Sequence, residues 1–322
     1  MDAIRLHTYG PAANLRLETV PDPAPGPGDA RMAVHAVGLH FIETLMRQGQ
    51  AVGPHPAPPL PAVLGTEIAG VVESVGEGVP AEFVGRRVVT SGVTSGGYAS
   101  LAVAPASSLT TLPDHVDYGP AVAMNTTGAT TFGLLELAPL SPSDVVLATA
   151  AAGGIGTLLV QYARRAGARV IGAAGGPAKV ARAEELGADL AVDYRQPGWD
   201  KLVREAFGEV TVTFDGVGDE LGRAAYGLLG RGGRYVVFGA AAGEWFVPGK
   251  EDAAARDVTV YEGIAYLLGR DGGVGDLAAR ALDAVADGSL TPAVQAFPLA
   301  RAAAAHEALE SRNTMGKVIL VP

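Results

Sequence analysis

A glycine-rich run in the middle of the chain has the residue types and spacing of a phosphate-binding turn. Residues 150–156 read Ala-Ala-Ala-Gly-Gly-Ile-Gly. Gly153 and Gly154 let the backbone turn sharply and approach a pyrophosphate, and Gly156 permits close packing of a helix on a strand. The free N–H groups and the dipole of a following helix favour the same anion. A glycine triplet alone is weak evidence, so the flanking elements decide its meaning.

Those flanking elements are a buried strand and an amphipathic helix. Residues 144–149 read Asp-Val-Val-Leu-Ala-Thr, an apolar run typical of a buried strand. From Ile155 to Ala166 the apolar residues recur at i, i+3, i+4, i+7, i+8 and i+11, and Gly167 is placed to end the helix. A strand, a glycine turn and a helix in this order predict dinucleotide binding. The alternative is a glycine-rich turn that binds nothing.

The region after the turn bears on which dinucleotide is bound. NAD sites place an acidic residue about 20 positions after the motif, where it binds the ribose 2′-hydroxyl. Here a second strand, Ala168–Ala174, ends at Gly175-Gly176, and no Asp or Glu occurs from Thr157 to Ala183. Lys179 follows instead, and a cation without a competing carboxylate favours a 2′-phosphate. We therefore expect NADPH rather than NADH; the alternative is that Lys179 is an ordinary solvated residue.

Further strands and helices alternate along the same part of the chain. A helix from Pro177 to Gly187 comes first, and the elements after it are a strand at Asp189–Asp193, a helix near Asp200–Phe207, a strand at Val210–Asp215, another helix and a strand at Arg234–Phe238. Strands that alternate with helices indicate βαβ units and a parallel sheet.

The first hundred residues have a different pattern, with short strands between Pro- and Gly-rich turns. Strands are expected at Ala3–Leu6, Arg31–Val37, Ile68–Val75, Arg87–Thr90 and Tyr98–Val103, and a short helix at Phe41–Arg47. This pattern favours a compact barrel or sandwich. The last part contains a helix at Arg301–Glu310 and a strand at Lys317–Val321, and is too short to form a domain alone. We expect one domain of residues 1–122 and 264–322, with residues 123–263 inserted into it.

Composition excludes several kinds of chemistry. The 322 residues include no cysteine, so disulfides, Cys-ligated zinc, iron–sulfur clusters and thiol nucleophiles are excluded. The formal net charge of −10 argues against nucleic acid as a partner, because phosphate binding needs clustered positive charge. The uncharged stretches 48–66 and 145–163 are interrupted by prolines and glycines, and the N-terminus lacks the pattern of a signal peptide. A cytoplasmic protein without membrane spans is expected.

Taken together, the ordered motifs of the chain resemble those of the medium-chain dehydrogenases/reductases. Residues 64–76, Leu-Gly-Thr-Glu-Ile-Ala-Gly-Val-Val-Glu-Ser-Val-Gly, are similar to the G-x-E-x-x-G-x-V-x-x-V-G segment of that family. Further motifs follow in the family's order: Gly97-Tyr98-Ala99, Gly128-Ala129-Thr130, the Ala150–Gly156 turn, Asp193-Tyr194-Arg195, Asp215-Gly216-Val217-Gly218, Gly232-Gly233-Arg234 and Ala305-His306-Glu307 with Gly316-Lys317-Val318. The set resembles the zinc-independent quinone oxidoreductase (zeta-crystallin-like) branch over nearly the whole chain. This implies an α/β fold in which a Rossmann-type domain is inserted in a GroES-like, mostly-β barrel domain.

The resemblance also implies roles in binding NADPH. It assigns Thr130 to the nicotinamide carboxamide; Gly153, Gly154 and Ile155 to the pyrophosphate; Gly175, Lys179 and Tyr194 to the adenosine ribose phosphate; Val217, Phe238, Gly239 and Ala240 to the nicotinamide side; and Lys317 to the vicinity of the cofactor. For Tyr194 the alternative is a ring packed at the end of a strand.

The zinc ligands of related enzymes are missing from the matching positions. A Cys, a His and a third ligand of the zinc-dependent relatives correspond to His40, Thr66 and, by rough alignment, Ala123. One possible ligand cannot build a catalytic zinc site, which needs three protein ligands. No metal site is therefore expected.

The segment expected near the substrate departs from the branch. Residues 40–45 read His-Phe-Ile-Glu-Thr-Leu, whereas the branch usually has N-F-x-D-x-Y. His40 is the candidate catalytic residue, because an imidazole can donate a hydrogen bond or a proton near neutral pH. The alternative is a structural histidine held by hydrogen bonds. The other histidines have no comparable context and are expected to be structural or on the surface: His7, His35, His55, His115 and His306.

These features favour NADPH-dependent, metal-free reduction of a quinone, with hydrogen bonds in place of a metal to polarise the carbonyl. The alternatives are an NADPH-dependent reductase of enone or enal double bonds, and a protein that binds NADPH without turnover. The branch commonly forms homodimers by joining sheet edges, for which Arg234–Phe238 and Thr259–Tyr261 are candidates.

Overall fold

The chain forms two compact units in the computed structural model, which describes residues 1–51 and 56–322. Unit 1 consists of Met1–Thr126 and Leu282–Pro322, and unit 2 of Thr127–Ala281. Unit 2 therefore begins four residues later and ends 18 residues later than the expected 123–263. The reason for the later end is packing within unit 2, where Leu267 and Leu277 lie against Gly133.

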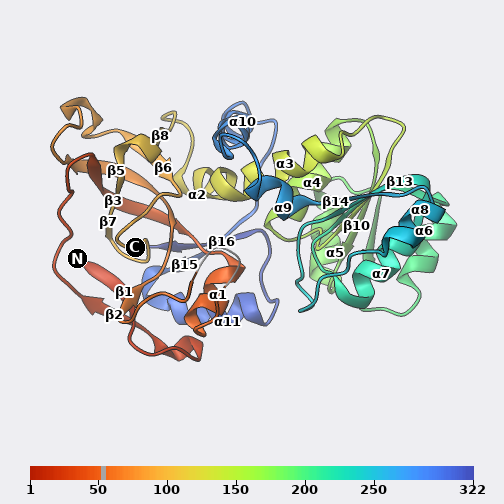
Figure 1. Ribbon diagram of the computed structural model, residues 1–322, viewed down its shortest axis with the longest axis horizontal. Coiled ribbons are helices and arrows are strands. Elements are labelled where there is room, and N and C mark those ends of the chain that lie inside the picture. The colour runs from red at the N-terminus through yellow and green to blue at the C-terminus, as the bar shows by residue number, and fades with distance from the viewer. Residues whose placement is uncertain (52–55) are drawn as a thin grey trace. The chain divides into compact units, whose positions relative to one another are not determined.

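Unit 1 is built on two sheets (Figure 1). The smaller has the order β2-β1-β4, and the larger has the order β15-β16-β3-β5-β6-β8, with β7 also paired to β3. The strands are β1 (Asp2–Leu6), β2 (Leu15–Thr19), β3 (Asp29–Gly38), β4 (Ala62–Val63), β5 (Glu67–Val75), β6 (Arg87–Thr90), β7 (Leu101–Pro105), β8 (Thr110–Thr111), β15 (Val294–Pro298) and β16 (Lys317–Val321). The helices are α1 (Phe41–Arg47), α2 (Tyr118–Val122) and α11 (Ala302–Glu310). A π-helical segment, Ala123–Gly128, directly follows α2. Short 3-10 turns occur at Ala12–Asn14, Ala81–Phe83, Ala106–Ser108 and Leu299–Arg301.

The core of unit 1 joins the two ends of the chain. Alternate residues of β3, among them Ala30 and Met32, face a cluster that also contains Ala305 of α11 and Leu320 of β16. β16 pairs antiparallel with β3, so the last strand of the chain lies beside one of the first. This pairing brings Lys317 of β16 to the end of β3 that leads into α1.

Unit 2 is a six-stranded parallel sheet in the order β11-β10-β9-β12-β13-β14. Its strands are β9 (Val145–Thr149), β10 (Arg169–Ala174), β11 (Leu190–Asp193), β12 (Val210–Asp215), β13 (Leu229–Val237) and β14 (Thr259–Glu262). Its helices are α3 (Ala129–Leu137), α4 (Gly154–Arg165), α5 (Pro177–Glu185), α6 (Trp199–Phe207), α7 (Asp219–Gly227), α8 (Lys250–Ala255), α9 (Gly263–Leu268) and α10 (Gly275–Ala286), the last of which ends in unit 1. In sequence order of the strands this is the arrangement 3-2-1-4-5-6 of dinucleotide-binding sheets.

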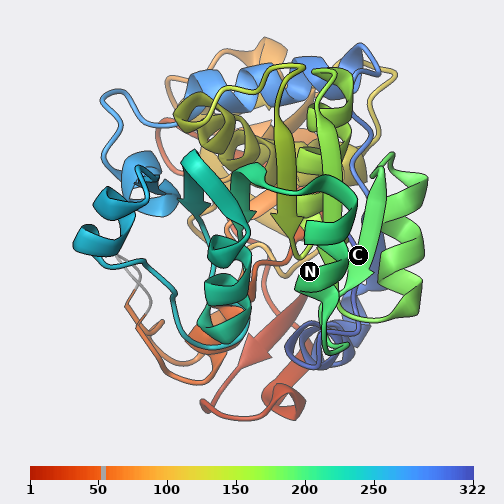
Figure 2. The same cartoon turned by 90° about the vertical axis from the view of Figure 1, so that its right-hand side faces the viewer.

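The parallel sheet is covered on both faces (Figure 2). Successive residues of β9 contribute to two different clusters: Val146 and Ala148 to one, and Val145 and Leu147 to the other. Because neighbouring side chains of a strand point to opposite faces, each face has its own core. The expected α/β fold, a Rossmann-type sheet together with a mostly-β domain, is confirmed.

Several expected elements agree with the structure residue for residue, namely α1, β6, β12 and β16. Other bounds differ. Tyr98 precedes β7 rather than starting it, and β13 begins at Leu229 rather than Arg234. The expectation that β13 supplies a free sheet edge is wrong, because β13 is paired with β12 on one side and β14 on the other. In the described part of the chain no helix is long and apolar enough to cross a membrane.

Candidate active site

The glycine-rich turn of unit 2 joins β9 to α4 and is very tight. Ala150 has a positive φ of 49° although it is not a glycine, and its carbonyl oxygen accepts the N–H of Gly153 at 2.8 Å. A Cβ on Gly156 would overlap that same carbonyl oxygen, so only glycine allows α4 to start so close to the strand. The turn is also tied to the neighbouring strand, because the N–H of Ala151 donates to Ala173 at 3.0 Å.

The expected pyrophosphate-binding residues lie at the start of α4, with Gly153 preceding the helix and Gly154 and Ile155 opening it. This helix has 12 residues and no acidic residue in its first turn. Its first N–H groups and its dipole therefore favour an anion. The turn and the helix fit a dinucleotide pyrophosphate.

The next turn of unit 2 brings together the residues expected at the adenosine ribose phosphate. Gly175 and Gly176 connect β10 to α5, and Lys179 lies in the first turn of α5. The ring of Tyr194 lies over Gly175, where a Cβ would be 3.1 Å from it. The three expected residues therefore surround one turn, at the same edge of the sheet as the pyrophosphate turn.

A buried carboxylate organises the turn after β12. Asp215 is fully buried, and it accepts hydrogen bonds from Thr149 Oγ1 at 2.8 Å, Val217 N at 3.0 Å and Tyr235 Oη at 2.7 Å. Burial and this carboxylate raise the pKa of the Tyr235 hydroxyl far above its usual range, so Tyr235 remains a donor. Asp215 thus fixes the backbone at Val217. Its motif was recognised in the sequence, but its role was missed.

The residues expected on the nicotinamide side also come together in unit 2. The Phe238 ring lies against Gly216, and a Cβ on Gly239 would be 2.6 Å from the Gly216 carbonyl oxygen. Val217 accepts the N–H of Ala242 at 2.8 Å, which closes the loop that contains Ala240. Thr130, the remaining expected residue of this unit, is half-buried in the first turn of α3.

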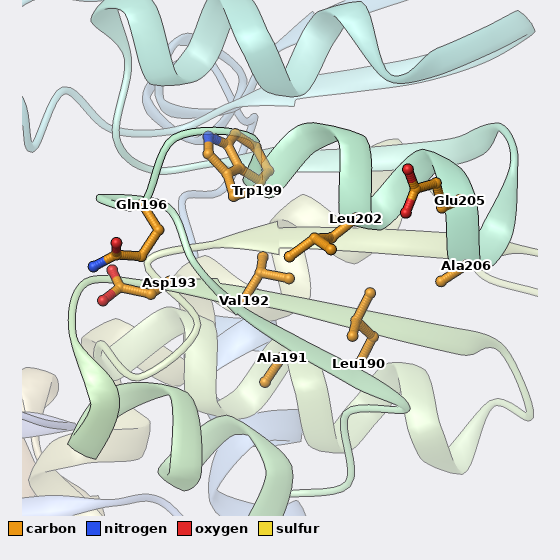
Figure 3. Close-up of a pocket in the computed structure, with 9 residues that line it drawn as sticks. All are labelled: Leu190, Ala191, Val192, Asp193, Gln196, Trp199, Leu202, Glu205 and Ala206. Atoms are coloured by element: carbon orange, nitrogen blue, oxygen red, sulfur yellow. The ribbon is translucent and has the colours of Figure 1, made fainter.

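A hollow in the surface of unit 2 lies along the edge strand β11 and not at the residues expected to bind the cofactor's pyrophosphate or nicotinamide. Figure 3 shows the carboxylate of Asp193 and the amide of Gln196 at one end of this hollow and Glu205 at the other. The remaining lining side chains are all apolar and come from β11 and α6. The hollow does not contain the glycine turns.

Unit 1 contains a polar cluster of three residues, His40, Glu67 and Lys317. Glu67 Oε2 lies 2.9 Å from His40 Nε2 and 3.0 Å from Lys317 Nζ. Lys317 Nζ also lies 3.0 Å from His40 Nε2 and 3.2 Å from His40 Nδ1. Glu67 and Lys317 are buried, whereas the His40 side chain is 21% exposed. His40 is therefore the member of the cluster that reaches the surface of unit 1.

The chain makes room for the Glu67 carboxylate and satisfies its second oxygen. A Cβ on Gly38, at the end of β3, would overlap Glu67 Oε2. Glu67 Oε1 accepts the N–H of Thr126 at 2.8 Å and the side-chain amide of Asn125 at 3.4 Å, both from the π-helical segment. Irregular helical turns of this kind are frequent at functional sites.

The contacts define which protons the cluster carries. Burial acts to raise the pKa of Glu67, but Lys317 and His40 more than offset this and hold the pKa well below its usual range. An ionised Glu67 accepts a hydrogen bond from His40 Nε2–H and another from the Lys317 ammonium. Lys317 Nζ is about equally far from both ring nitrogens of His40, so its contact with the ring does not select one of them.

A second buried chain of side chains positions the helix that His40 precedes. Glu43 Oε2 accepts the backbone N–H of His40 and the hydroxyl of Tyr98, each at 2.9 Å. Tyr98 is 3.0 Å from His306 Nε2, and His306 Nδ1 is 3.3 Å from Arg47 Nε. Because an arginine only donates, His306 Nδ1 accepts, so His306 Nε2–H donates to Tyr98. The chain therefore has one direction, from Arg47 to Glu43.

The other histidines of the described residues have structural or surface contacts. His306 is fully buried and structural, as expected. His7 contacts Glu18 on the surface, His35 stacks on Tyr118, and His115 contacts the carbonyl of Ala286. His55 lies outside the described residues.

A metal ion does not fit the polar cluster of unit 1. The place beside Glu67 and His40 is taken by the Lys317 ammonium, itself a cation. Among residues 1–51 and 56–322 no three His, Asp or Glu side chains are grouped so as to hold a metal ion.

Comparisons with known proteins agree with this geometry. Residues 26–114 match the GroES-like domain model of alcohol dehydrogenases, and residues 154–268 match the model of zinc-binding dehydrogenases. A quinone oxidoreductase of Salmonella typhimurium is 33% identical over 99% of both chains. The chain belongs to the medium-chain dehydrogenase/reductase family, in its quinone oxidoreductase branch.

Two further relatives differ in the activity that their names give. A 2-haloacrylate reductase of a Burkholderia species is 32% identical over 98% of both chains. The structure of Escherichia coli quinone oxidoreductase complexed with NADPH superposes with a TM-score of 0.86, at 29% identity and over 100% of both chains. The resemblance inferred from the sequence motifs is confirmed.

Proposed function

We propose that this protein is an oxidoreductase that uses NADPH to reduce quinones and does so without a metal ion. The observation that carries the proposal is the combination of a dinucleotide-binding turn in unit 2 with the His40–Glu67–Lys317 cluster in unit 1. The similarity to quinone oxidoreductases over the whole chain supports it.

Bound NADPH supplies the hydride, and the residues of this chain bind the cofactor and manage the proton. Gly153, Gly154 and Ile155 would bind its pyrophosphate through the N-terminus of α4. Gly175, Lys179 and Tyr194 would hold the ribose 2′-phosphate. The nicotinamide side would meet Thr130, Val217, Phe238, Gly239 and Ala240, with Lys317 assigned to the cofactor's vicinity by the family resemblance.

Reduction of a quinone to a hydroquinone consumes one hydride and one proton. We assign delivery of that proton to His40, the exposed member of the cluster. Lys317, whose Nζ lies within 3.2 Å of both ring nitrogens, would return a proton to His40, and Glu67 would hold both side chains in position. For this step His40 would carry a proton on both ring nitrogens, with Nε2–H on Glu67 and Nδ1–H on the substrate carbonyl, and this second hydrogen bond would polarise the carbonyl in place of a metal.

His40→Ala tests this role, because alanine can neither donate a hydrogen bond nor carry the proton, whereas asparagine is the residue that the branch usually has at this position. We expect a 10²- to 10⁴-fold lower kcat with 1,4-benzoquinone, and loss of the pH dependence of kcat, while the affinity for NADPH is retained. Unchanged kcat and pH profile would refute the assignment to His40. If the unaltered protein does not oxidise NADPH with any quinone, the proposed function itself is wrong.

A second candidate function is the reduction of conjugated carbon–carbon double bonds. It is favoured by the similarity to 2-haloacrylate reductase, and the same residues can deliver hydride and proton across an enone or enal. NADPH oxidation with short 2-enals and with 1,4-benzoquinone, compared by kcat/KM, separates the two. Tight NADPH binding with no oxidation by either class would indicate a non-catalytic protein.

We also propose a homodimer formed through β14. This strand is an edge of the six-stranded sheet, and an unpaired edge can pair with a second copy. Thr259–Tyr261, one of the two segments expected to supply such an edge, lies in β14.

A further inference from the structure

Arg195 and Asp193 form an ion pair beside the turn between β10 and α5. Arg195 Nε is 3.1 Å from Asp193 Oδ1, and Nη2 is 3.1 Å from Oδ2, so the guanidinium and the carboxylate meet side by side. Asp193 Oδ1 also accepts the N–H of Gly176 at 3.0 Å. The pair is therefore attached to the turn that bears the expected phosphate-binding residues.

The glycine at position 176 brings this guanidinium close to the start of α5. Gly176 has a φ of 103°, and a Cβ there would overlap Arg195 Nη2. Lys179 lies in the first turn of α5, which contains no acidic residue. Two cationic side chains and the positive end of a nine-residue helix are thus gathered at one turn.

Folding stability does not explain this pair. The Arg195 side chain is 57% exposed and that of Asp193 is 14% exposed, so solvent screens the guanidinium and the pair contributes little to stability. The hydrogen bonds from Arg195 hold the pKa of Asp193 at about 2, so this carboxylate is ionised at neutral pH. Alone, it would repel a phosphate at the turn. Paired, it holds Arg195 in place and its charge is cancelled.

The guanidinium keeps donors for a ligand. Of its five N–H groups, one on Nε and one on Nη2 donate to Asp193, which leaves the other Nη2 hydrogen and both on Nη1. A guanidinium can present one edge to a carboxylate and another to a phosphate.

We propose that Arg195, held by Asp193 against Gly176, selects a nicotinamide cofactor that carries a 2′-phosphate. The proposal rests on the proposed use of NADPH and adds to it the residue pair that discriminates against NADH. It also makes Asp193 a positioning residue, whose charge favours NADPH only while Arg195 is present.

Binding titrations with four ligands test the proposal: NADPH, NADH, 2′,5′-ADP and 5′-AMP. We expect Arg195→Ala to lower the affinity for NADPH and for 2′,5′-ADP by at least about tenfold. The guanidinium donors to the phosphate are lost, and the charge of Asp193 is no longer neutralised. The affinities for NADH and 5′-AMP should change by less than about threefold. The melting temperature should stay within about 2 °C, as befits an exposed pair.

Arg164→Ala is the matched control. The Arg164 side chain is 59% exposed and pairs with Asp189 at 2.9 Å. Asp189 directly precedes β11, whereas Asp193 is the last residue of that strand. Its loss should leave the NADPH-to-NADH affinity ratio unchanged. If Arg195→Ala behaves in the same way as Arg164→Ala, the inference is wrong.

The double variant Asp193→Asn/Arg195→Ala separates repulsion from lost donors, because asparagine removes the charge and keeps an oxygen that can accept the N–H of Gly176. It should bind 2′,5′-ADP several-fold more tightly than Arg195→Ala alone, because the uncovered carboxylate is gone. No recovery would contradict the role given to Asp193. If the unaltered protein binds 2′,5′-ADP no better than 5′-AMP, the proposed NADPH specificity fails, whereas a preference insensitive to Arg195 refutes only this inference.

Discussion

In the His40–Glu67–Lys317 cluster of unit 1, one buried carboxylate contacts both a histidine and a lysine side chain. Lys317 and Glu67 are both inside the protein, and a charge left there without its partner is costly. The three side chains therefore depend on each other for stability as well as for any proton transfer.

Glu67→Gln tests this dependence, since it removes the charge and keeps the shape. We expect a loss of about 3 kcal/mol in the free energy of unfolding, because the Lys317 ammonium remains buried without a counterion. Urea unfolding followed by circular dichroism measures the change. Glu67→Gln/Lys317→Met removes both charges and should recover part of the loss. Equal or greater destabilisation of the double variant would show that the two charges are not coupled.

His306 makes the stability of unit 1 depend on pH. Burial, with a smaller contribution from Arg47, lowers the pKa of His306 from 6.5 to about 3. The folded protein therefore keeps His306 neutral while the unfolded chain binds a proton below pH 6.5. Its contribution to stability is complete above pH 6.5 and is lost as the pH falls toward 3. Between pH 7 and 5 this amounts to about 2 kcal/mol.

His306→Gln should remove that part of the pH dependence. Unfolding free energies of the variant and the unaltered protein, measured from pH 7 to 5, should differ in slope. Parallel curves would show that His306 takes up its proton in the folded state as well.

At the scale of elements, α4 lies so close to the turn before it that a single added methyl group, at Gly156, tests the importance of this contact. Gly156→Ala places a methyl group on the Ala150 carbonyl, so we expect at least a tenfold loss of NADPH affinity and lower stability. Gly227→Ala, at the end of α7, is the control. A Cβ there meets no atom within 4 Å, so stability should rise by up to about 1 kcal/mol. Similar effects of both variants on binding and stability would contradict this account.

Sequence reasoning succeeded where the local pattern decides the element. The apolar periodicity of α4, the glycine turns and the alternation of strands and helices predicted the parallel sheet. Among the elements it missed are β15 and α10: β15 is a half-exposed edge strand without clear alternation, whereas α10 does carry an apolar face, with Leu277 and Ala281 buried, and was overlooked.

Most of the unit 1 site could not be predicted from the sequence. His40 was a candidate, but its partners Glu67 and Lys317 are 27 and 277 positions away in the chain. Glu67 was part of a recognised motif, yet no local signal connects it with Lys317. Such contacts arise from the pairing of β16 with β3, a property of the whole fold.

At the scale of the whole molecule, the proposed dimer gives β14 and β11 different environments. Both are edges of the same sheet, but only β14 is proposed to be covered. Light scattering should give twice the 32.6 kDa chain mass, and hydrogen exchange should be slower for amides of β14 than for those of β11. A mass of one chain would refute the dimer, and equal exchange would place its interface elsewhere.

The sequence of unit 2 is inserted between the two segments of unit 1, and this determines the order in which the two units are synthesised. A ribosome synthesises all of unit 2 before it makes β15, α11 and β16. Until then β3 lacks its neighbour β16, and the carboxylate of Glu67 has no ammonium beside it. The nucleotide-binding half is therefore the first to be complete during synthesis, and the cluster that would handle the proton is assembled last, when Lys317 arrives.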